Sequence, residues 1–291
     1  MKWTIDKKHE GMTVRHYLQN VRGFSRRLLR SIKHDGGFIK VNGKPEHLAF
    51  LLTAGDVLAV RFPEEKKGVY MQPEPVPLSI VYEDDAILVL NKPAKMATIP
   101  SRHHPTGTLA NGILHHYKTN DIPYTIHVVT RLDRNTSGLV LVAKHKYSHS
   151  ILSADQKAGG IRRKYQAIVE GDLAQPKGSI CLPIGRKDGS IIERTVTQAG
   201  KKATTHYTTV RKTNEHTFVD IELETGRTHQ IRVHFAHIGH PLAGDNLYGG
   251  SCQRINRQAL HCCELILHHP ITKKRLVFTS ALPNDMAKLF A

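Results

Sequence analysis

Hydrophobic and polar positions along residues 1–62 follow two helical patterns and then two strand patterns. Residues 14–21 carry apolar side chains at the spacing of one helix face, with Thr13 before them as a capping residue, and residues 26–33 repeat this arrangement after Ser25. The segments FIKVNGK and LTAGDVLAVRF then read as strands, and the Asn-Gly pair in the first is typical of a tight hairpin. The pattern predicts a small α/β domain of two helices and a hairpin sheet.

The pattern changes at residues 63–77, where four prolines and few core-type residues indicate a semi-rigid linker. Residues 78–291 are then dominated by strand-like runs with a few helical patches. A regular βαβ rhythm is missing, and so are a G-x-G-x-x-G motif and a Walker A glycine loop, which disfavours dinucleotide and triphosphate sites. We therefore predict a second, α+β domain with a mixed, largely antiparallel sheet flanked by helices.

The composition indicates the class of partner. Lys and Arg number 42 against 25 Asp and Glu, a net charge of +17, so the expected partner is a polyanion. Charge alone does not separate RNA from DNA or from a membrane surface. No stretch approaches the roughly 18 apolar residues of a membrane span, the N-terminus lacks the apolar segment of a signal peptide, and the four cysteines form no regular framework. These features predict a soluble protein of a reducing cytoplasm.

A row of cations follows one side of the second predicted helix. Arg26, Arg30 and Lys33 recur at the spacing of one helix face, opposite the apolar side, with Arg27 adjoining them and no carboxylate among them. Such a row is either a solvated helix face or a set of phosphate contacts, and both interpretations stay open on spacing alone.

A single carboxylate in the segment TRLDRNTSG, residues 130–138, is the first candidate for chemistry. Asp133 lies between Arg131 and Arg134 in a polar turn between two predicted strands. It is either half of a surface Arg-Asp pair or a catalytic group. A neighbouring arginine favours the charged carboxylate, which suits a nucleophile or a general base.

Two further segments carry candidate residues. The apolar positions of RTHQIRVHFAHIG have helical spacing, which predicts that Arg227 stands at the start of a helix and faces an anion there, unless it is simply exposed. Tyr165 lies in the alternating strand RRKYQAIVEG, on one face with Ala167 and Val169. It is either a core aromatic or a surface on which a nucleobase stacks.

The 20 histidines suggest metal, but their spacing does not. None is joined to a CxxC, an HExxH or an HxE…PCxxC arrangement, so we expect no metal site and no zinc deaminase. No G-x-S-x-G elbow is present, which disfavours a serine hydrolase.

Taken together, these segments resemble the RluA family of RNA pseudouridine synthases. The resemblance lies in TRLDRNTSGLVLVAK, RRKYQAIVEG, TGRTHQIRVHFAHIGHPLAGDNLYG and HCCELILHHPITKKRLVFTSALP, whose order and spacing also fit across residues 78–285. The N-terminal unit resembles an S4-type RNA-binding domain in FSRRLLRSIKHDGGFIKVNG and AGDVL. The resemblance implies an S4-like domain over residues 1–62 and the pseudouridine synthase fold over residues 78–291.

The family isomerises uridine in structured RNA, and the resemblance implies the same activity here, on 23S-type ribosomal RNA and without cofactor or metal. By resemblance Asp133 is the catalytic aspartate, Tyr165 the active-site tyrosine and Arg227 the arginine that pairs with the aspartate. Arg131 is similar to the arginine that enters the RNA when the target base is flipped. Thr130 stands where many members have histidine. Attack at the sugar and addition to the uracil ring both stay open.

The resemblance also sets the expected partner and the rival functions. We expect RNA, no DNA, no membrane, and a cytoplasmic monomer. One rival is a non-catalytic S4-type RNA-binding or ribosome-associated factor, but Asp133, Tyr165 and Arg227 are all retained. A second rival, a nuclease or nucleic-acid hydrolase, needs a metal-carboxylate cluster or a paired histidine site, for which the spacing is poor.

Overall fold

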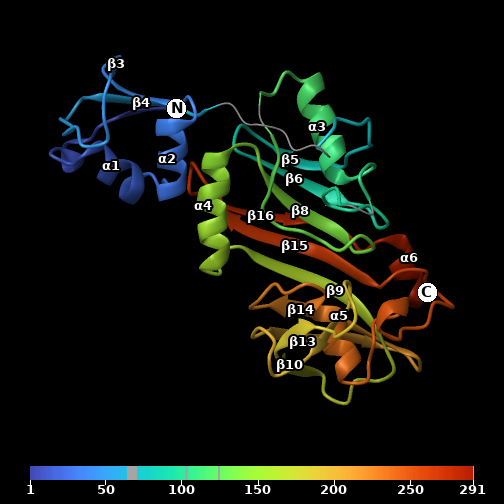
Figure 1. Ribbon diagram of the computed structural model, residues 1–291. Coiled ribbons are helices and arrows are strands. Elements are labelled where there is room, and N and C mark those ends of the chain that lie inside the picture. The colour runs from blue at the N-terminus through green and yellow to red at the C-terminus, as the bar shows by residue number, and fades with distance from the viewer. Residues whose placement is uncertain (64–70, 102–103, 124, 291) are drawn as a thin grey trace.

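A computed structural model describes residues 1–63, 71–101, 104–123 and 125–290. It contains a small N-terminal unit beside a large sheet that is covered by helices (Figure 1). In the part of the chain that the structure describes, no helix is both long and apolar enough to cross a membrane.

The N-terminal unit has the predicted helices and hairpin. Thr13 caps the first helix by accepting the N–H of His16 at 3.2 Å, and Ser25 caps the second by accepting the N–H of Leu28 at 3.1 Å. The Asn-Gly turn is left-handed at both residues, with φ of 51° and 81°. The sheet has the order β1-β4-β2-β3. The elements are β1 (Lys2–Thr4), the 3-10 turn η1 (Lys7–His9), α1 (Val14–His16), the π-helical turn η2 (Tyr17–Val21), α2 (Arg26–His34), β2 (Phe38–Val41), β3 (Lys44–Pro45) and β4 (Val57–Arg61).

The larger part is an α+β unit built on one ten-stranded sheet, and this confirms the predicted fold class. The order is β10-β13-β14-β9-β15-β8-β6-β5, with β16 beside β15 and β7 beside β8. All its pairings are antiparallel except the one between β15 and β8. The strands are β5 (Ile80–Glu83), β6 (Ile87–Lys92), β7 (His127–Val128), β8 (Ser137–Ala143), β9 (Arg162–Glu170), β10 (Lys177–Cys181), β13 (Thr204–Lys212), β14 (His216–Leu223), β15 (Leu260–His268) and β16 (Arg275–Thr279).

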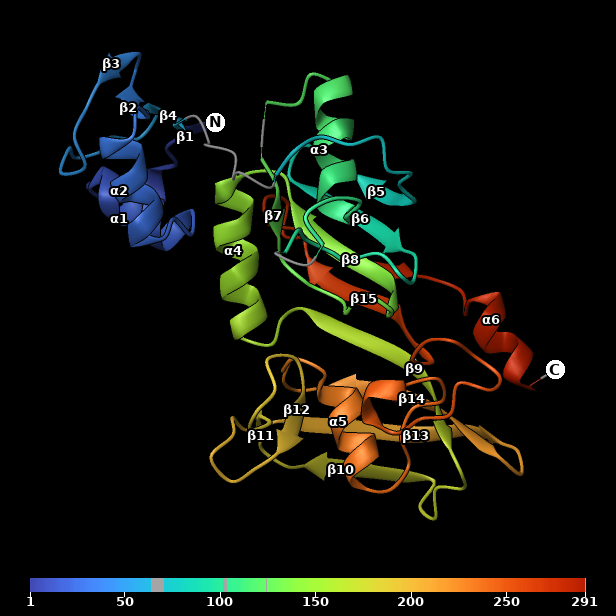
Figure 2. The same ribbon diagram turned by 45° about the vertical axis from the view of Figure 1, so that its right-hand side comes forward.

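Helices and a small hairpin complete this unit (Figure 2). The helices are α3 (Leu109–Thr119), α4 (Lys146–Lys157), α5 (Gln230–His237) and α6 (Asn284–Ala287), the 3-10 turns are η3 (Asn246–Tyr248) and η4 (Lys288–Phe290), and the hairpin strands are β11 (Ile184–Arg186) and β12 (Arg194–Val196).

The strand pairing changes from antiparallel to parallel at the centre of the sheet, where β8 lies beside β15. Gly138 pairs with Cys262 there and has φ of 113°. A Cβ at this position would overlap the carbonyl oxygen of Cys262, so only glycine fits. Every residue of β8 is buried, which places the turn before it, residues 129–136, at the end of a rigid central strand.

The predicted linker over residues 63–77 is only partly described, because residues 64–70 lie outside the described residues. Its second half packs on α3 of the large unit. The side-chain amide of Asn111 donates to the carbonyl of Gln72 at 2.8 Å, and the N–H of Glu74 donates to the carbonyl of Asn111 at 3.1 Å. Residues 71–77 therefore follow the surface of the large unit.

Candidate active site

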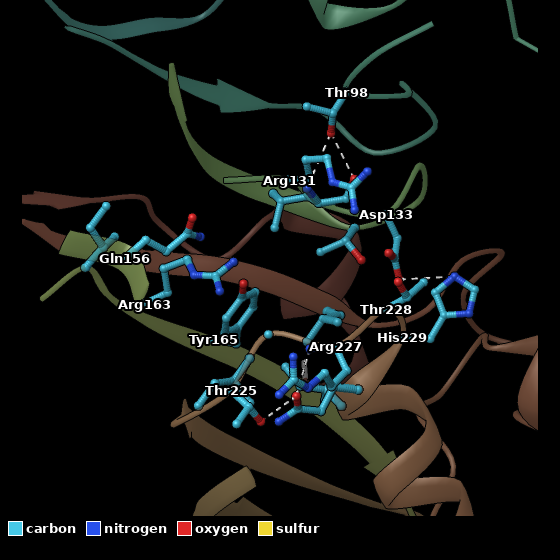
Figure 3. A pocket seen from close by; sticks show the side chains of 18 of the residues that line it. Thr98, Arg131, Asp133, Gln156, Arg163, Tyr165, Thr225, Arg227, Thr228 and His229 are labelled. Carbon is cyan, nitrogen blue, oxygen red and sulfur yellow. Dashed lines mark hydrogen bonds and ion pairs between the residues drawn. The ribbon is translucent and has the colours of Figure 1, made fainter. Parts of the chain in front are cut away.

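A cleft of about 1280 Å³ opens beside the central strands, and Asp133 lines it (Figure 3). Its walls carry nine Lys and Arg against three Asp and Glu. The volume exceeds that of a typical small-molecule pocket. The cleft can therefore take a nucleotide with its neighbours and attract their phosphates.

The turn that carries Asp133 is fixed from behind by hydrogen bonds. The hydroxyl of Thr98 donates to the carbonyl of Leu132 at 2.9 Å. The fully buried amino group of Lys92 donates to three carbonyls, those of Pro93, Met96 and Arg134, at 2.8–3.1 Å. Burial lowers the pKa of Lys92 to about 7. These bonds leave the backbone of the turn little freedom to move.

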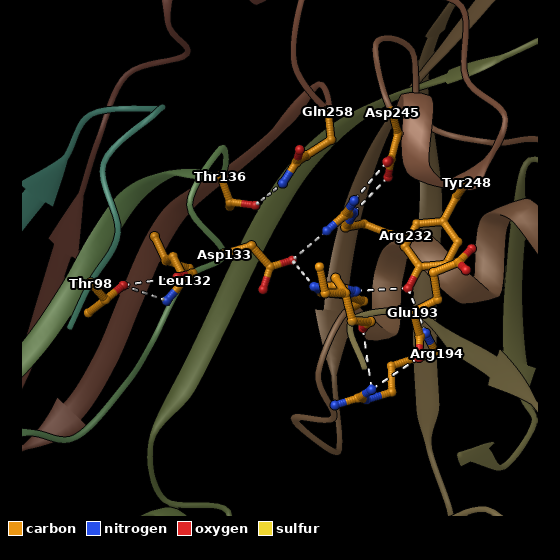
Figure 4. A network of polar contacts seen from close by, with 12 residues as sticks. Thr98, Leu132, Asp133, Thr136, Glu193, Arg194, Arg232, Asp245, Tyr248 and Gln258 are labelled. Carbon is orange, nitrogen blue, oxygen red and sulfur yellow. Dashed lines mark hydrogen bonds and ion pairs between the residues drawn. The ribbon is translucent and has the colours of Figure 1, made fainter. Parts of the chain in front are cut away.

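The ion-pair partner of Asp133 is Arg232 of α5, and the prediction that Arg227 pairs with it is wrong (Figure 4). Nη1 of Arg232 lies 3.2 Å from Oδ2 of Asp133. The same guanidinium makes two bonds to Asp245, from Nε at 2.7 Å and from Nη2 at 2.8 Å. Burial opposes the charge of Arg232, but the bonds to Asp245 and Asp133 outweigh it and raise the pKa of Arg232. Arg232 is therefore a fixed positive charge beside the carboxylate.

A second group faces Asp133 from the same segment. Nε2 of His229 lies 3.8 Å from Oδ2 of Asp133. The hydroxyl oxygen of Tyr248 accepts the N–H of Arg194 at 3.0 Å and lies at hydrogen-bond distance, 2.8 Å, from Nδ1 of His229. Burial lowers the pKa of His229, which favours the neutral ring at neutral pH. His229 holds a left-handed φ of 57°, a strained conformation outside glycine.

Arg227 lies in a turn before α5 and not at its start, which corrects the predicted helix boundary. The helix begins at Gln230, whose side-chain oxygen accepts the N–H of Arg227 at 2.9 Å and the hydroxyl of Thr225 at 2.8 Å. These bonds hold residues 225–229 as a turn. The guanidinium of Arg227 is exposed on the cleft wall and donates to the carbonyl of Lys202 at 3.0 Å.

Tyr165 is a core aromatic that also reaches the cleft, so the stacking role stays a prediction. It is 4% exposed and belongs to the main hydrophobic cluster with Ala167 and Val169, yet it also lines the cleft. The guanidinium carbon of Arg163 lies 5.8 Å from the centre of its ring. Burial raises the pKa of Tyr165, so its hydroxyl is protonated at neutral pH.

Arg131 and Thr130, next to each other before Asp133, have different surroundings. Arg131 is exposed and lines the cleft, as expected for a residue that meets RNA. Thr130 is buried, and its hydroxyl accepts the N–H of Leu141 at 2.9 Å. Thr130 therefore ties the turn to β8.

The cations of α2 form an exposed row. Arg26, Arg27, Arg30 and Lys33 are exposed, whereas Leu28, Leu29 and Ile32 of the same helix are buried. None of the four has a carboxylate within 4 Å among the residues that the structure describes. The row is thus free to meet an outside anion.

Within the described ranges, no group of three or more His, Cys, Asp and Glu could hold a metal ion. The polar groups of the cleft instead meet one another, as the network around Asp133 shows (Figure 4).

Three groups at Asp133 escaped the sequence analysis: Arg232, Asp245 and His229. A signal existed for Arg232, since it is a lone charge in the apolar run QIRVHFA, and such a residue inside a buried helix needs a partner. Asp245 and His229 carry no comparable signal, because their roles depend on how two loops meet.

The match to known proteins agrees with this geometry. Residues 86–237, more than half of the chain, match the family described as RNA pseudouridylate synthase. The chain belongs to this family, whose enzymes are isomerases that convert uridine in RNA to pseudouridine, and the resemblance to pseudouridine synthases is confirmed.

Similar proteins include two bacterial ones. The chain is 51% identical over 278 residues to "Uncharacterized RNA pseudouridine synthase YjbO" of Bacillus subtilis, covering 96% of this chain and 98% of the relative. It is 38% identical over 266 residues to "Ribosomal large subunit pseudouridine synthase D" of Yersinia pestis, covering 86% and 81%. Among solved structures, "Human RNA Pseudouridylate Synthase Domain Containing 1" matches with a TM-score of 0.59 at 23% identity, covering 75% of this chain and 86% of that one, which shows the shared fold.

Proposed function

We propose that the cleft isomerises uridines of large-subunit ribosomal RNA, with Asp133 as the catalytic carboxylate. The observation that carries the proposal is the pairing of Asp133 with Arg232, a buried arginine that Asp245 holds in place. Relatives named for the ribosomal large subunit support the choice of RNA.

The reaction needs a charged carboxylate at a fixed place. The bond from the ribose anomeric carbon to uracil N1 breaks, the base turns, a bond forms to C5, the C5 proton leaves, and N1 gains a proton, so that the product is an isomer of uridine. Asp133 either adds to the sugar or assists its deprotonation, or else it adds to the uracil ring. Arg232 orients the carboxylate during these steps through its hydrogen bond, and the ring of His229 lies beside the same oxygen.

A uridine cannot turn inside a stack, so the target base must be flipped into the cleft. The ring of Tyr165 offers it a stacking surface. We assign its hydroxyl to the relay of the C5 proton, in which the oxygen accepts that proton as its own proton passes to another acceptor, because burial keeps the hydroxyl protonated beforehand. Arg131 is exposed at the cleft and suited to fill the gap left in the RNA. Arg227, exposed on the wall, is assigned to the RNA backbone and not to Asp133.

The N-terminal unit is assigned to RNA binding as an S4-like domain over residues 1–62, separated from the catalytic domain by the chain from 63 to 77. Arg26, Arg27, Arg30 and Lys33 would contact phosphates, since they are exposed and have no ion-pair partner among the described residues. We assign the protein to the cytoplasm, as a monomer that acts on RNA and not on DNA.

The test is to incubate the protein with an unmodified transcript of large-subunit ribosomal RNA labelled with tritium at uracil C5. We expect release of tritium to water and new pseudouridines at fixed positions, both absent with Asp133→Asn. Mapping pseudouridines in cells with and without the protein would then identify the sites. Binding without tritium release from any cellular RNA would instead favour the non-catalytic RNA-binding factor.

A further inference from the structure

At the contact between the N-terminal unit and the catalytic domain, one side chain of the latter belongs to the hydrophobic core of the former. Among the described residues, the buried cluster of the N-terminal unit takes its members from residues 5–60 and from one residue outside them, Tyr147 of α4. The ring of Tyr147 lies 4.5 Å from that of Phe24 and 6.3 Å from that of Trp3. Its hydroxyl donates to the carbonyl of Arg22 at 2.7 Å.

The same face of α4 adds further contacts. Ile151, one turn after Tyr147, packs against this cluster and lies beside Gly23. Phe62 stacks on Tyr147 with ring centres 6.0 Å apart. Burial raises the pKa of Tyr147 to about 12, as expected for a ring enclosed by both domains. The contact is thus a packed, aromatic interface with its one hydroxyl satisfied.

The other end of α4 reaches the cleft. Gln156 and Lys157 line the cavity that contains Asp133, and a helix of twelve residues is about 18 Å long. α2, which carries the exposed cations, lies beside α4 (Figures 1 and 2). One helix therefore joins the two surfaces that are assigned to RNA.

We propose that Tyr147 locks the N-terminal unit onto α4, so that the phosphates held by α2 and the uridine at Asp133 are kept at one separation. The part concerning RNA rests on the proposed function. A domain on a loose tether accepts RNAs of many shapes, whereas a docked domain favours those whose stem and target uridine match its spacing. Tyr147 is in this sense a positioning residue for the choice of substrate.

The lock can be tested without RNA, because Trp3 is the sole tryptophan of the chain and lies in the interface. Time-resolved fluorescence anisotropy of Trp3 in the full chain should decay with the rotation of the whole protein. Tyr147→Ala should add the faster rotation of a released N-terminal unit, while Tyr147→Phe, which keeps the ring, should behave as wild type. Ser150→Ala, on the same helix, is the matched control. A fast component of domain size in the wild type would overturn the lock.

Folding of each variant is checked by circular dichroism, and Ile151→Ser is the second variant should Tyr147→Ala not fold. Whether or not the variants fold, the anisotropy decay of the wild type shows whether the two domains rotate together. If both variants fold and neither shows a fast rotation of the N-terminal unit, Tyr147 and Ile151 do not hold the domains together.

The positioning role is tested by kinetics on a transcript of large-subunit ribosomal RNA and on nested stem-loop fragments around each modified uridine. Tyr147→Ala should lose about tenfold in kcat/KM on the longest RNA, since release lowers the effective concentration of one site for the other. It should keep wild-type kcat/KM on the shortest stem-loop, which reaches only the cleft. Equal losses on all lengths, or none on any, would overturn the positioning role. No conversion by the wild type would contradict the proposed function and leave the anisotropy result standing.

Discussion

The cations of α2 and the arginine at Asp133 carry the same charge in opposite surroundings. Arg26, Arg30 and Lys33 are exposed and have no carboxylate partner among the described residues, so their charges are screened by salt and are free to exchange partners. Arg232 is 6% exposed and bonded to both Asp133 and Asp245. Exposed, hydrated side-chain charges are suited to bind a polyanion. A buried guanidinium that is held in one position is suited to orient a single reacting group.

The sharpest test of the buried side of this comparison is Asp133→Asn. The amide keeps the shape of the carboxylate but loses its charge, so turnover should fall by several powers of ten. RNA binding should stay within a few fold, because the residues proposed to contact phosphates lie elsewhere. Single-turnover tritium release and a filter-binding isotherm measure the two quantities. Activity above about one per cent of wild type would remove Asp133 from the chemistry.

Arg232→Ala and Arg227→Ala form a matched pair, since both remove an arginine that lines the same cleft. Loss of Arg232 leaves Asp245 buried without a partner and should destabilise the fold by about 3–5 kcal/mol. It should also slow turnover by about 10²- to 10³-fold, as the loss of a fixed active-site charge does. Arg227→Ala should keep the wild-type unfolding temperature and weaken RNA binding only. Thermal unfolding measures the loss of stability, and single-turnover rates measure the loss of turnover. Equal rate losses in the two variants would show that Arg232 and Arg227 do not differ in their roles in the reaction.

Tyr165→Phe separates the ring from its hydroxyl. The variant should bind RNA as the parent does and turn over about a hundredfold more slowly, the usual cost of removing a proton-transfer group. Tyr165→Leu, which also loses the stacking surface, should lose binding as well. Rates at saturating RNA measure the first effect. Full activity of the phenylalanine variant would leave Tyr165 a stacking role alone.

The exposed side of the comparison is tested by replacing Arg26, Arg27, Arg30 and Lys33 together with Gln. If each neutralises one phosphate, the slope of log affinity against log salt should lessen by roughly 3 to 4 units. The rate at saturating RNA should change little, because none of the four lines the cleft. A salt titration of binding beside single-turnover kinetics measures both. An unchanged slope would make the row an ordinary solvated helix face.

The local pattern was enough to predict much of the fold. The caps at Thr13 and Ser25, the Asn-Gly hairpin and the alternation around Tyr165 each depend on residues within a few positions of one another, and each is found in the structure. The mixed, largely antiparallel sheet followed from strand-like runs without a βαβ rhythm. Asp133 was placed on a turn at the end of a buried strand for the same local reasons.

The pairing of Asp133 with Arg227 was carried over from the family resemblance, whereas the start of α5 at Arg227 was predicted from helical spacing, and the structure differs at both points. Gln230 closes the turn that contains Arg227, which moves the start of α5 three residues along the chain and brings Arg232 to face Asp133. Helical spacing does not reveal a side chain that competes for the helix start. The place of Tyr147 was equally hidden, since its pattern describes a helix of the large domain and says nothing of a second core.

The position of Tyr147 in the core of the N-terminal unit also limits where the chain can be divided into separate domains. A catalytic domain that began at residue 78 would turn Tyr147 and Ile151 toward water as an adhesive patch. The N-terminal unit, cut away, would keep a hole in its core where the ring had been. Neither part has a completely packed core on its own. An N-terminal unit exchanged between relatives, by recombination in evolution or by design, therefore needs the matching residues of α4 to be exchanged as well.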